Sequence, residues 1–241
     1  MSKKKPTEEF YSLFQFIYDF LNKNLFENEL PDCMIVITRK GRTFGYFYPQ
    51  RWINEEKEKT DEIAINPFFF DKKPLIEILQ TMAHEMCHLW QFHLGTPSRR
   101  SYHNKEWGGK MMYIGLMPSN TGKPGGKKTG QQMMDYPMKK GLFVKASNKL
   151  INQKKFKTLW YDRVNKQNQL NTISLDENSV YNDLDLNEIL LEVHHNADME
   201  VYSSKTKSKY KCPSCEISLW GKQGLFIICG NCDQELDFID F

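Results

Sequence analysis

The chain has 241 residues, 40% of them hydrophobic and 26% charged, as is usual for a globular protein in water. It contains no apolar run of the roughly 18 residues that cross a bilayer, and its N-terminal segment is too acidic for a signal peptide, so we expect a cytoplasmic protein with no membrane partner. The net charge of +3 conceals a segregation: residues 96–166 carry 16 basic and 3 acidic side chains, whereas residues 167–200 carry 8 acidic and no Lys or Arg.

The first part of the sequence predicts one helix followed by a small sheet. Apolar residues recur at helical spacing over residues 8–28, which indicates an amphipathic helix. Three short runs at residues 34–37, 43–48 and 61–66 are rich in β-branched residues or alternate apolar and polar positions, as strands do. We expect these runs to form a small antiparallel sheet, which makes the fold class α+β.

Helical periodicity returns after Pro74, a residue that favours the start of a helix. The apolar stripe runs to Gly95, where glycine marks the helix end, and a second helix is expected over residues 104–116. Residues 118–141 are rich in Gly, Lys and Pro and predict an extended loop. The acidic stretch 170–200 has enough apolar positions for one helix.

The long central helix carries the sequence His84-Glu85-Met86-Cys87-His88. Positions i and i+4 lie on the same helix face, so both imidazoles can point at one ion, and zinc accepts neutral imidazole nitrogens well. Glu85 lies about 100° around the helix from His84, beside the ion without being forced to coordinate it. A carboxylate there can take a proton from zinc-activated water and deliver it to the leaving amine. The motif predicts a catalytic zinc site with Glu85 as the general base.

A third protein ligand is expected, because hydrolytic zinc sites usually have three ligands and one open position. His103 is favoured, since it precedes a helix that could fold back on the first, and Glu106 is the alternative. His93 lies about 140° around the helix from the second histidine and points away. His194 and His195 are candidates far along the chain.

The stretch from Thr81 to His88, followed by the segment 103–107, resembles the SprT-like family. The resemblance covers residues 8–117 and implies a zincin-like metallopeptidase fold. The family often has Gly-Pro after the third histidine, where this chain has Asn104-Lys105. This difference affects the start of the following helix more than the ligand itself. By this resemblance the metal ligands are His84, His88 and His103, the general base is Glu85, and the aromatic residue after the third ligand is Trp107.

Four cysteines near the C-terminal end form two C-x2-C pairs separated by 13 residues. Such pairs hold one tetrahedral zinc, and four thiolates close its coordination shell, so this zinc would be structural. Apolar runs at residues 217–220 and 225–228 bracket two glycines and predict a strand–turn–strand, as in a zinc ribbon. SprT-like proteins often end in a similar ribbon. The predicted ligands are Cys212, Cys215, Cys229 and Cys232.

Basic side chains gather around the third ligand and the loop that follows it. With aromatic neighbours such as Tyr102, they could follow a phosphate backbone and stack bases, although a solvated surface balanced by the acidic stretch is the alternative. The family resemblance favours association with DNA, and with single strands in particular. The basic residues are Arg99, Arg100, Lys105, Lys110, Lys123, Lys127, Lys128, Lys139 and Lys140.

These features together predict a zinc-dependent endopeptidase with one catalytic and one structural zinc. By resemblance its substrates are DNA-associated or DNA-crosslinked proteins. The alternatives are a cytosolic regulatory protease without DNA dependence and a non-catalytic DNA-binding zinc protein. We expect a catalytic domain at residues 1–141, an extension at 142–203 that is basic and then acidic, and a zinc ribbon at 204–241.

Overall fold

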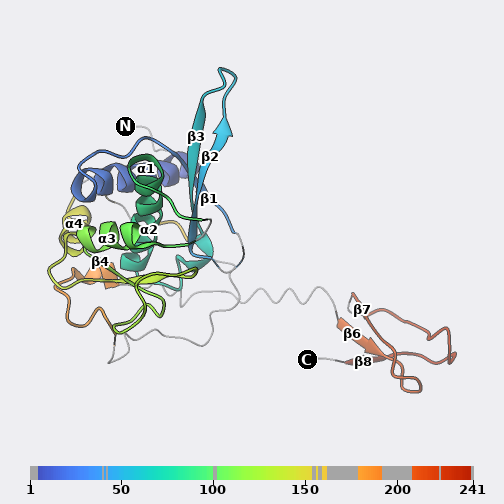
Figure 1. Cartoon of the computed structure of the whole chain (residues 1–241). Helices are drawn as coiled ribbons and strands as arrows, with labels where there is room; N and C mark the ends of the chain where they lie inside the picture. Colours follow the sequence, from blue (N-terminus) through green and yellow to red (C-terminus); the bar gives the residue numbers. More distant parts are fainter. Residues whose placement is uncertain are drawn as a thin grey trace. The chain divides into compact units, whose positions relative to one another are not determined.

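The computed structural model divides into two compact units, Met1–Ala197 and Asp198–Phe241, each described here by itself (Figure 1). Within the described residues, no helix combines the length and the apolar character needed to cross a membrane. The structure describes residues 5–39, 41, 43–99, 102–153, 156, 159–161, 179–191, 208–222 and 224–239.

Two 20-residue helices, α1 (Pro6–Leu25) and α2 (Leu75–Leu94), form the centre of the first unit. Pro74 precedes α2 and Gly95 follows its end, as the sequence predicted, whereas α1 begins at Pro6, slightly before the predicted start near residue 8. Three shorter helices and a 3-10 turn complete the unit: α3 (Lys105–Ile114), α4 (Leu142–Ile151), α5 (Glu188–Leu191) and η1 (Pro67–Phe69).

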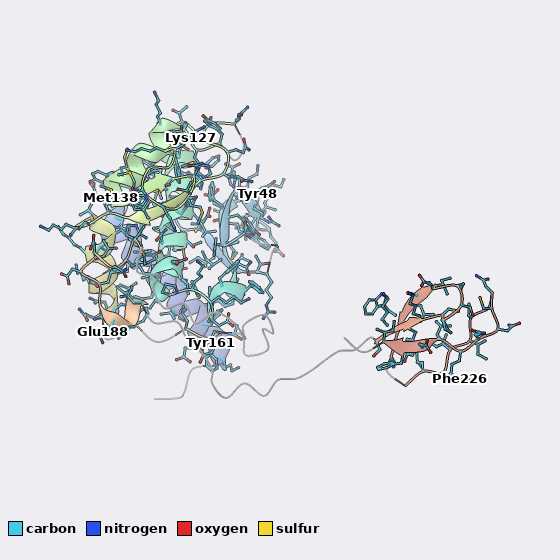
Figure 2. The ribbon with its side chains drawn as sticks, turned by 90° about the horizontal axis from the view of Figure 1, so that it is seen from below. Tyr48, Lys127, Met138, Tyr161, Glu188 and Phe226 are labelled. Carbon is cyan, nitrogen blue, oxygen red and sulfur yellow. The ribbon has the colours of Figure 1, made fainter. Side chains whose placement is uncertain are left out.

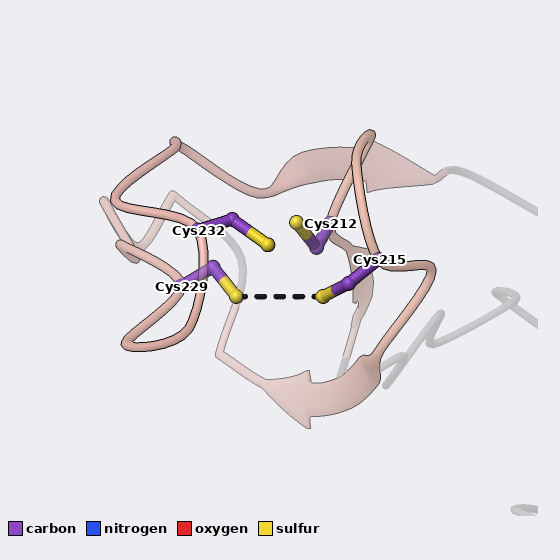
Figure 3. Close-up of side chains that lie close together, drawn as sticks. All are labelled: Cys212, Cys215, Cys229 and Cys232. Atoms are coloured by element: carbon purple, nitrogen blue, oxygen red, sulfur yellow. Dashed lines mark hydrogen bonds between the residues drawn. The ribbon is translucent and has the colours of Figure 1, made fainter.

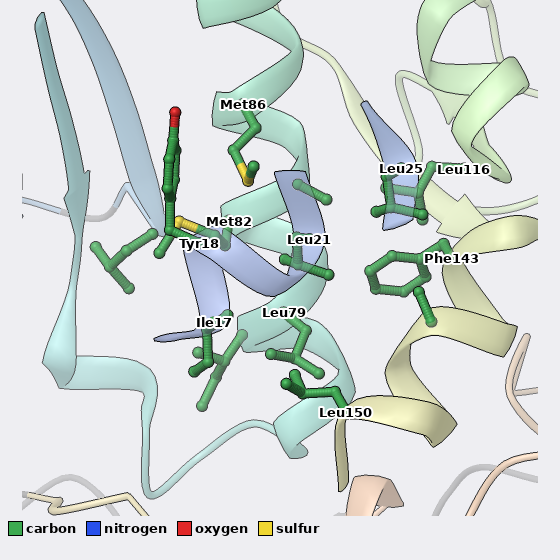
Figure 4. Packing of buried hydrophobic residues seen from close by; sticks show 14 of the residues in the cluster. Ile17, Tyr18, Leu21, Leu25, Leu79, Met82, Met86, Leu116, Phe143 and Leu150 are labelled. Carbon is green, nitrogen blue, oxygen red and sulfur yellow. The ribbon is translucent and has the colours of Figure 1, made fainter. Parts of the chain in front are cut away.

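The core forms where α1, α2 and α4 bury their apolar faces against one another (Figure 4). Phe143 and Leu150 of α4 are fully buried in it, so this helix belongs to the core of the first unit although the predicted catalytic domain ended at residue 141. The predicted domain boundaries stay a prediction. Buried side chains at this junction are Ile17, Tyr18, Leu21 and Leu25 of α1 and Leu79, Met82 and Met86 of α2.

The larger sheet contains β1 (Met34–Ile37), β2 (Gly45–Ile53) and β3 (Lys59–Ile65) in the order β1-β3-β2. Strands β2 and β3 form the expected antiparallel hairpin, but β1 pairs with β3 in parallel. The prediction of an antiparallel sheet was therefore wrong for β1. The sheet is mixed, because β1 runs parallel to β3 whereas β2 runs antiparallel to it.

A second, two-stranded sheet lies within the segment predicted as an extended loop. Strands β4 (Leu116–Ser119) and β5 (Met134–Pro137) pair antiparallel. The prediction failed here because four-residue strands give little periodicity among many Gly and Lys residues. Gly115 ends α3 with φ of 93°, and a Cβ there would lie 2.6 Å from the Leu142 backbone nitrogen, so β4 starts against the beginning of α4.

The second unit contains β6 (Ser208–Lys211), β7 (Ser218–Gly221) and β8 (Asp237–Ile239) in the order β7-β6-β8. The predicted pairing of residues 217–220 with 225–228 is wrong, since β7 pairs with β6. Tyr210 of β6 is buried, and its hydroxyl donates to the Lys222 carbonyl at 2.6 Å and accepts from the Leu225 amide at 3.0 Å, so β6 also holds the segment after β7. Phe226 lies on the outside of this unit (Figure 2).

Candidate metal centre

Helix α2 carries His84 and His88 one turn apart on one face, with ring centroids 5.2 Å apart. The apolar stripe of the same helix is buried in the core: Leu79, Met82 and Met86 are at most 1% exposed. Burial of that stripe turns the two imidazoles away from the core and toward a cavity, as the i, i+4 spacing predicts.

His103 approaches α2 from the segment just before α3. Its backbone forms a bridge with Gly130, whose carbonyl accepts from the His103 amide at 2.8 Å. The Nε2 atoms of His103 and His88 lie 3.1 Å apart. The candidate ligand atoms of the three-histidine group, His84, His88 and His103, all lie within 4.8 Å of one another.

Two groups that were not predicted from the sequence contact the Nδ1 atoms of His84 and His103. His84 Nδ1 lies 2.8 Å from Asp135 Oδ2, and His103 Nδ1 lies 3.1 Å from the Gly130 carbonyl oxygen. An N–H at each Nδ1 leaves Nε2 available as a donor to a cation. Only one weak feature of the sequence marks Asp135 as unusual, which is that it is one of only 3 acidic residues in the basic segment 96–166.

The indole of Trp107 packs against all three imidazoles. Its ring centroid lies 4.9 Å from that of His84, 5.3 Å from that of His88 and 4.4 Å from that of His103. Trp107 is fully buried, and it enters α3 where the Asn104 side chain caps the helix by accepting from the Trp107 amide at 3.0 Å. The tryptophan therefore forms the floor of the three-histidine group and restricts rotation of its rings.

Burial and mutual charge set the protonation of the histidines. Burial, with the neighbouring His84 and His103, lowers the pKa of His88 well below its ordinary value. Burial and His84 likewise lower the pKa of His103 to about 4. Burial also acts to lower the pKa of His84, but the hydrogen bond to Asp135 and the charges of Glu85 and Asp135 outweigh it and raise that pKa. His88 and His103 are thus neutral at pH 7, as metal ligands must be.

Glu85 lies beside the histidines and is only 7% exposed. Burial raises the pKa of its carboxyl to about 7, although the charge of His84 acts in the opposite direction. Gly45 makes room for this residue at the start of β2. A Cβ on Gly45 would lie 2.8 Å from the Ala64 carbonyl oxygen, 2.8 Å from Thr81 Cγ2 and 3.4 Å from Glu85 Cγ.

An open cavity of about 1330 Å³ lies over the three histidines and Glu85. Its walls come from β2, the polar face of α2, the segment before α3 and the start of β5. The volume exceeds that of an ordinary small-molecule pocket, which is about 300–1,000 Å³.

The other candidate third ligands lie elsewhere. Glu106 Oε2 accepts from Gln91 Nε2 at 2.8 Å and from the Thr96 amide at 2.7 Å, so it ties the end of α2 to the start of α3. His93 Nε2 is paired with Asp61 Oδ2 at 2.6 Å. His194 and His195 lie outside the described residues.

The second unit brings its four cysteines together from two turns (Figure 3). Their sulfur atoms all lie within 4.8 Å of one another, and those of Cys215 and Cys229 are 3.6 Å apart. Hydrogen bonds from the Cys215 backbone lower the pKa of Cys212 to about 7, whereas the hydrogen bond with the Cys215 thiol raises the pKa of Cys232 to about 12. The raised pKa of Cys232 reflects the crowding of the thiols, which a cation would relieve.

The predicted basic residues are spread over several elements. Arg99 lines the cavity, and its guanidinium carbon lies 5.1 Å from the ring centroid of Tyr102, which also lines the cavity. Lys127 lies at an edge of the first unit (Figure 2). Arg100 is outside the described residues.

Lys110 differs from the rest, because its ammonium group faces three aromatic rings. The Nζ atom lies 5.3 Å from the ring centroid of Phe26, 5.0 Å from that of Trp90 and 4.9 Å from that of Tyr113. These rings come from the end of α1, from α2 and from α3, so Lys110 links the three helices.

Comparison with known proteins gives a family for the first unit. Residues 14–124 match the model of the SprT-like family, a range that contains the three histidines and Glu85 but not Gly130, Asp135 or the four cysteines. The chain is also 48% identical over 59 residues to a protein of Salmonella typhimurium described as an uncharacterized protein in the mucB 3' region, which covers 24% of this chain and 80% of that one. No solved structure matches the chain. The chain belongs to the SprT-like family.

Proposed function

We propose that this protein is a zinc-dependent endopeptidase with a zincin-like catalytic unit. The observation that carries the proposal is the convergence of His84, His88 and His103 beside the buried carboxylate of Glu85, under an open cavity of about 1330 Å³. Membership of the SprT-like family also supports a metallopeptidase.

The donor set fits zinc. Three imidazoles converge, and the Nδ1 atoms of two of them contact Asp135 and Gly130, which leaves their Nε2 atoms as donors of the kind zinc prefers. When bound, the zinc ion would supply Lewis-acid activation of water and of the scissile carbonyl group. The four-cysteine group fits a second, structural zinc, because four thiols fill a tetrahedral shell and leave no open position.

Glu85 is the proton carrier in this proposal. Its carboxylate would accept a proton from the attacking water and pass it to the leaving amine nitrogen. The neighbouring residues keep it near the histidines, since Gly45 lets β2 approach α2 closely at this point.

Strand β2 supports a polypeptide as the substrate. It is an edge strand whose only strand partner among the described residues is β3, and residues 45–48 line the cavity. An extended peptide could add to this edge through backbone hydrogen bonds, with its scissile bond over the histidines.

We extend the proposal to substrates bound or crosslinked to DNA, with single-stranded DNA as the favoured partner. The family resemblance supports this extension, as do Arg99 and Tyr102 at the cavity beside His103, where a cation and an aromatic ring could hold a phosphate and a base.

The test is digestion of a DNA-bound protein by the intact chain and by its Glu85→Gln variant, with and without single-stranded DNA. We expect cleavage by the intact chain, stimulation by single-stranded DNA and no cleavage by the variant. Equal cleavage without DNA would favour a regulatory protease, and equal function in both proteins would favour a non-catalytic role.

A further inference from the structure

A chain of hydrogen bonds runs from the metal centre to the acidic segment 179–191. We propose that Asp135, held by Gln80 and Tyr181, is a positioning residue that fixes the His84 imidazole toward the metal. The inference rests on the proposed metal site, but it concerns the binding of the ion and not the cleavage of a peptide.

The Asp135 carboxylate is buried, and one of its oxygens contacts the His84 imidazole. It is 7% exposed, and Oδ2 lies 2.8 Å from His84 Nδ1. Among the described residues, its other oxygen, Oδ1, is buried without a hydrogen-bond partner. A buried carboxylate that accepts a hydrogen bond from one imidazole determines which ring nitrogen carries the proton and in which direction Nε2 points.

Gln80 fixes the backbone of Asp135 to the helix that carries the ligand. It lies one turn before His84 on α2, and its Nε2 donates to the Asp135 carbonyl oxygen at 2.7 Å. Asp135 therefore contacts the same helix face twice, through its backbone and through its side chain, so β5 cannot shift along α2 without breaking one of these bonds.

Tyr181 orients Gln80 from the other side. Its hydroxyl donates to Gln80 Oε1 at 3.3 Å, which leaves the amide nitrogen of Gln80 directed at Asp135. Tyr181 is 8% exposed and belongs to the main core, as does Leu190, which is fully buried.

The segment that carries Tyr181 is held in place independently by Asn148 of α4. Asn148 Nδ2 donates to the Asp185 carbonyl at 2.6 Å, and Asn148 Oδ1 accepts from the Asn187 amide at 2.8 Å. Asp135 and Tyr181 both lie beyond residue 124, where the match to the family model ends. His84 lies inside the matched region, so residues from outside that region hold its imidazole in place.

The experiment measures cobalt binding by the whole chain, with the four-cysteine group kept filled by zinc. Asp135→Ala should weaken cobalt binding at the histidines by about 10–100-fold, the usual effect of losing such a partner, and should change the visible spectrum of the bound cobalt. Asp135→Asn should have a smaller effect, because an amide oxygen can still accept from Nδ1. Tyr181→Phe should have the smallest.

Asp61→Asn is the matched control, because Asp61 pairs with His93 at 2.6 Å through the same chemistry away from the three histidines. It should leave the affinity and the spectrum unchanged. Circular dichroism of each variant, with zinc in the four-cysteine group and no metal at the histidines, tests folding, and Asp135→Asn serves if Asp135→Ala does not fold. Unchanged affinity and spectrum in the Asp135 variants would overturn the inference. A chain that binds cobalt normally but cleaves no peptide would contradict the proposed function alone.

Discussion

The three-histidine group and the four-cysteine group differ in what holds their donors in place. The histidines come from α2 and from the segment before α3, and Asp135, Gly130 and Trp107 contact them at the edge of a large core. The cysteines come from two turns in a unit whose buried apolar cluster is Tyr210, Cys212, Cys229 and Leu236. A large core can position ligands before an ion arrives, whereas a small unit depends on its ion for folding.

The largest effect expected from this difference is the loss of the second unit in Cys229→Ser. Structural zinc in small domains contributes an apparent 10–16 kcal/mol or so, far more than four buried residues can supply. Zinc analysis should show one ion fewer per chain, and hydrogen exchange should show loss of protection over residues 208–239 with the first unit unchanged. Retained protection would mean that the small core folds without its ion.

Glu85→Gln should have the next largest effect, and on activity alone. Removal of a general base costs about 10²–10⁴-fold in rate, while both metal groups keep their ligands. The measurement is peptidase activity together with zinc content. Glu58→Gln, an exposed glutamate of the β2–β3 hairpin, is the control and should behave as the intact chain does.

Trp107→Ala tests whether the core supports the histidines. Loss of this fully buried indole should cost about 3–5 kcal/mol of stability in the first unit and weaken metal binding at the histidines only. Thermal unfolding and metal titration would show both effects. Equal weakening of metal binding at the four-cysteine group would contradict the inference that this core supports the three-histidine group alone.

The smallest effect is expected from Gly45→Ala. The added methyl group would press on Thr81 and the Ala64 carbonyl and displace β2 from Glu85, at a cost of about 1–3 kcal/mol, with lower activity and unchanged zinc content. Gly109→Ala is the matched control, because no atom lies within 4 Å of a Cβ added there. A Gly45 variant that is fully active would show that this close approach has no catalytic role.

Local patterns predicted α1, α2 and α3 but not α4, because those three helices each bury one apolar face and begin or end at Pro, Asn or Gly. The convergence of His84 and His88 follows from the same periodicity. The choice of His103 rested on its place before a helix that could fold back on α2, and the family resemblance implied the same ligand.

Pairings between distant segments could not be predicted from the sequence. The parallel contact of β1 with β3, the β4–β5 pair and the β6–β7 pair are all set by tertiary packing around short strands. Asp135 was missed for the same reason, since its partner lies 51 residues away and nothing in its local sequence marks a contact with His84.

The segment that runs from Gly130 into β5 contacts two of the three candidate metal ligands. Gly130, near the end of the β4–β5 loop, contacts His103, and Asp135, in β5 just after that loop, contacts His84. Shortening or lengthening residues 120–129 would therefore move both imidazoles in concert, whichever residues were removed or added. The length of this loop, more than its composition, is a single variable on which the geometry of the metal centre depends.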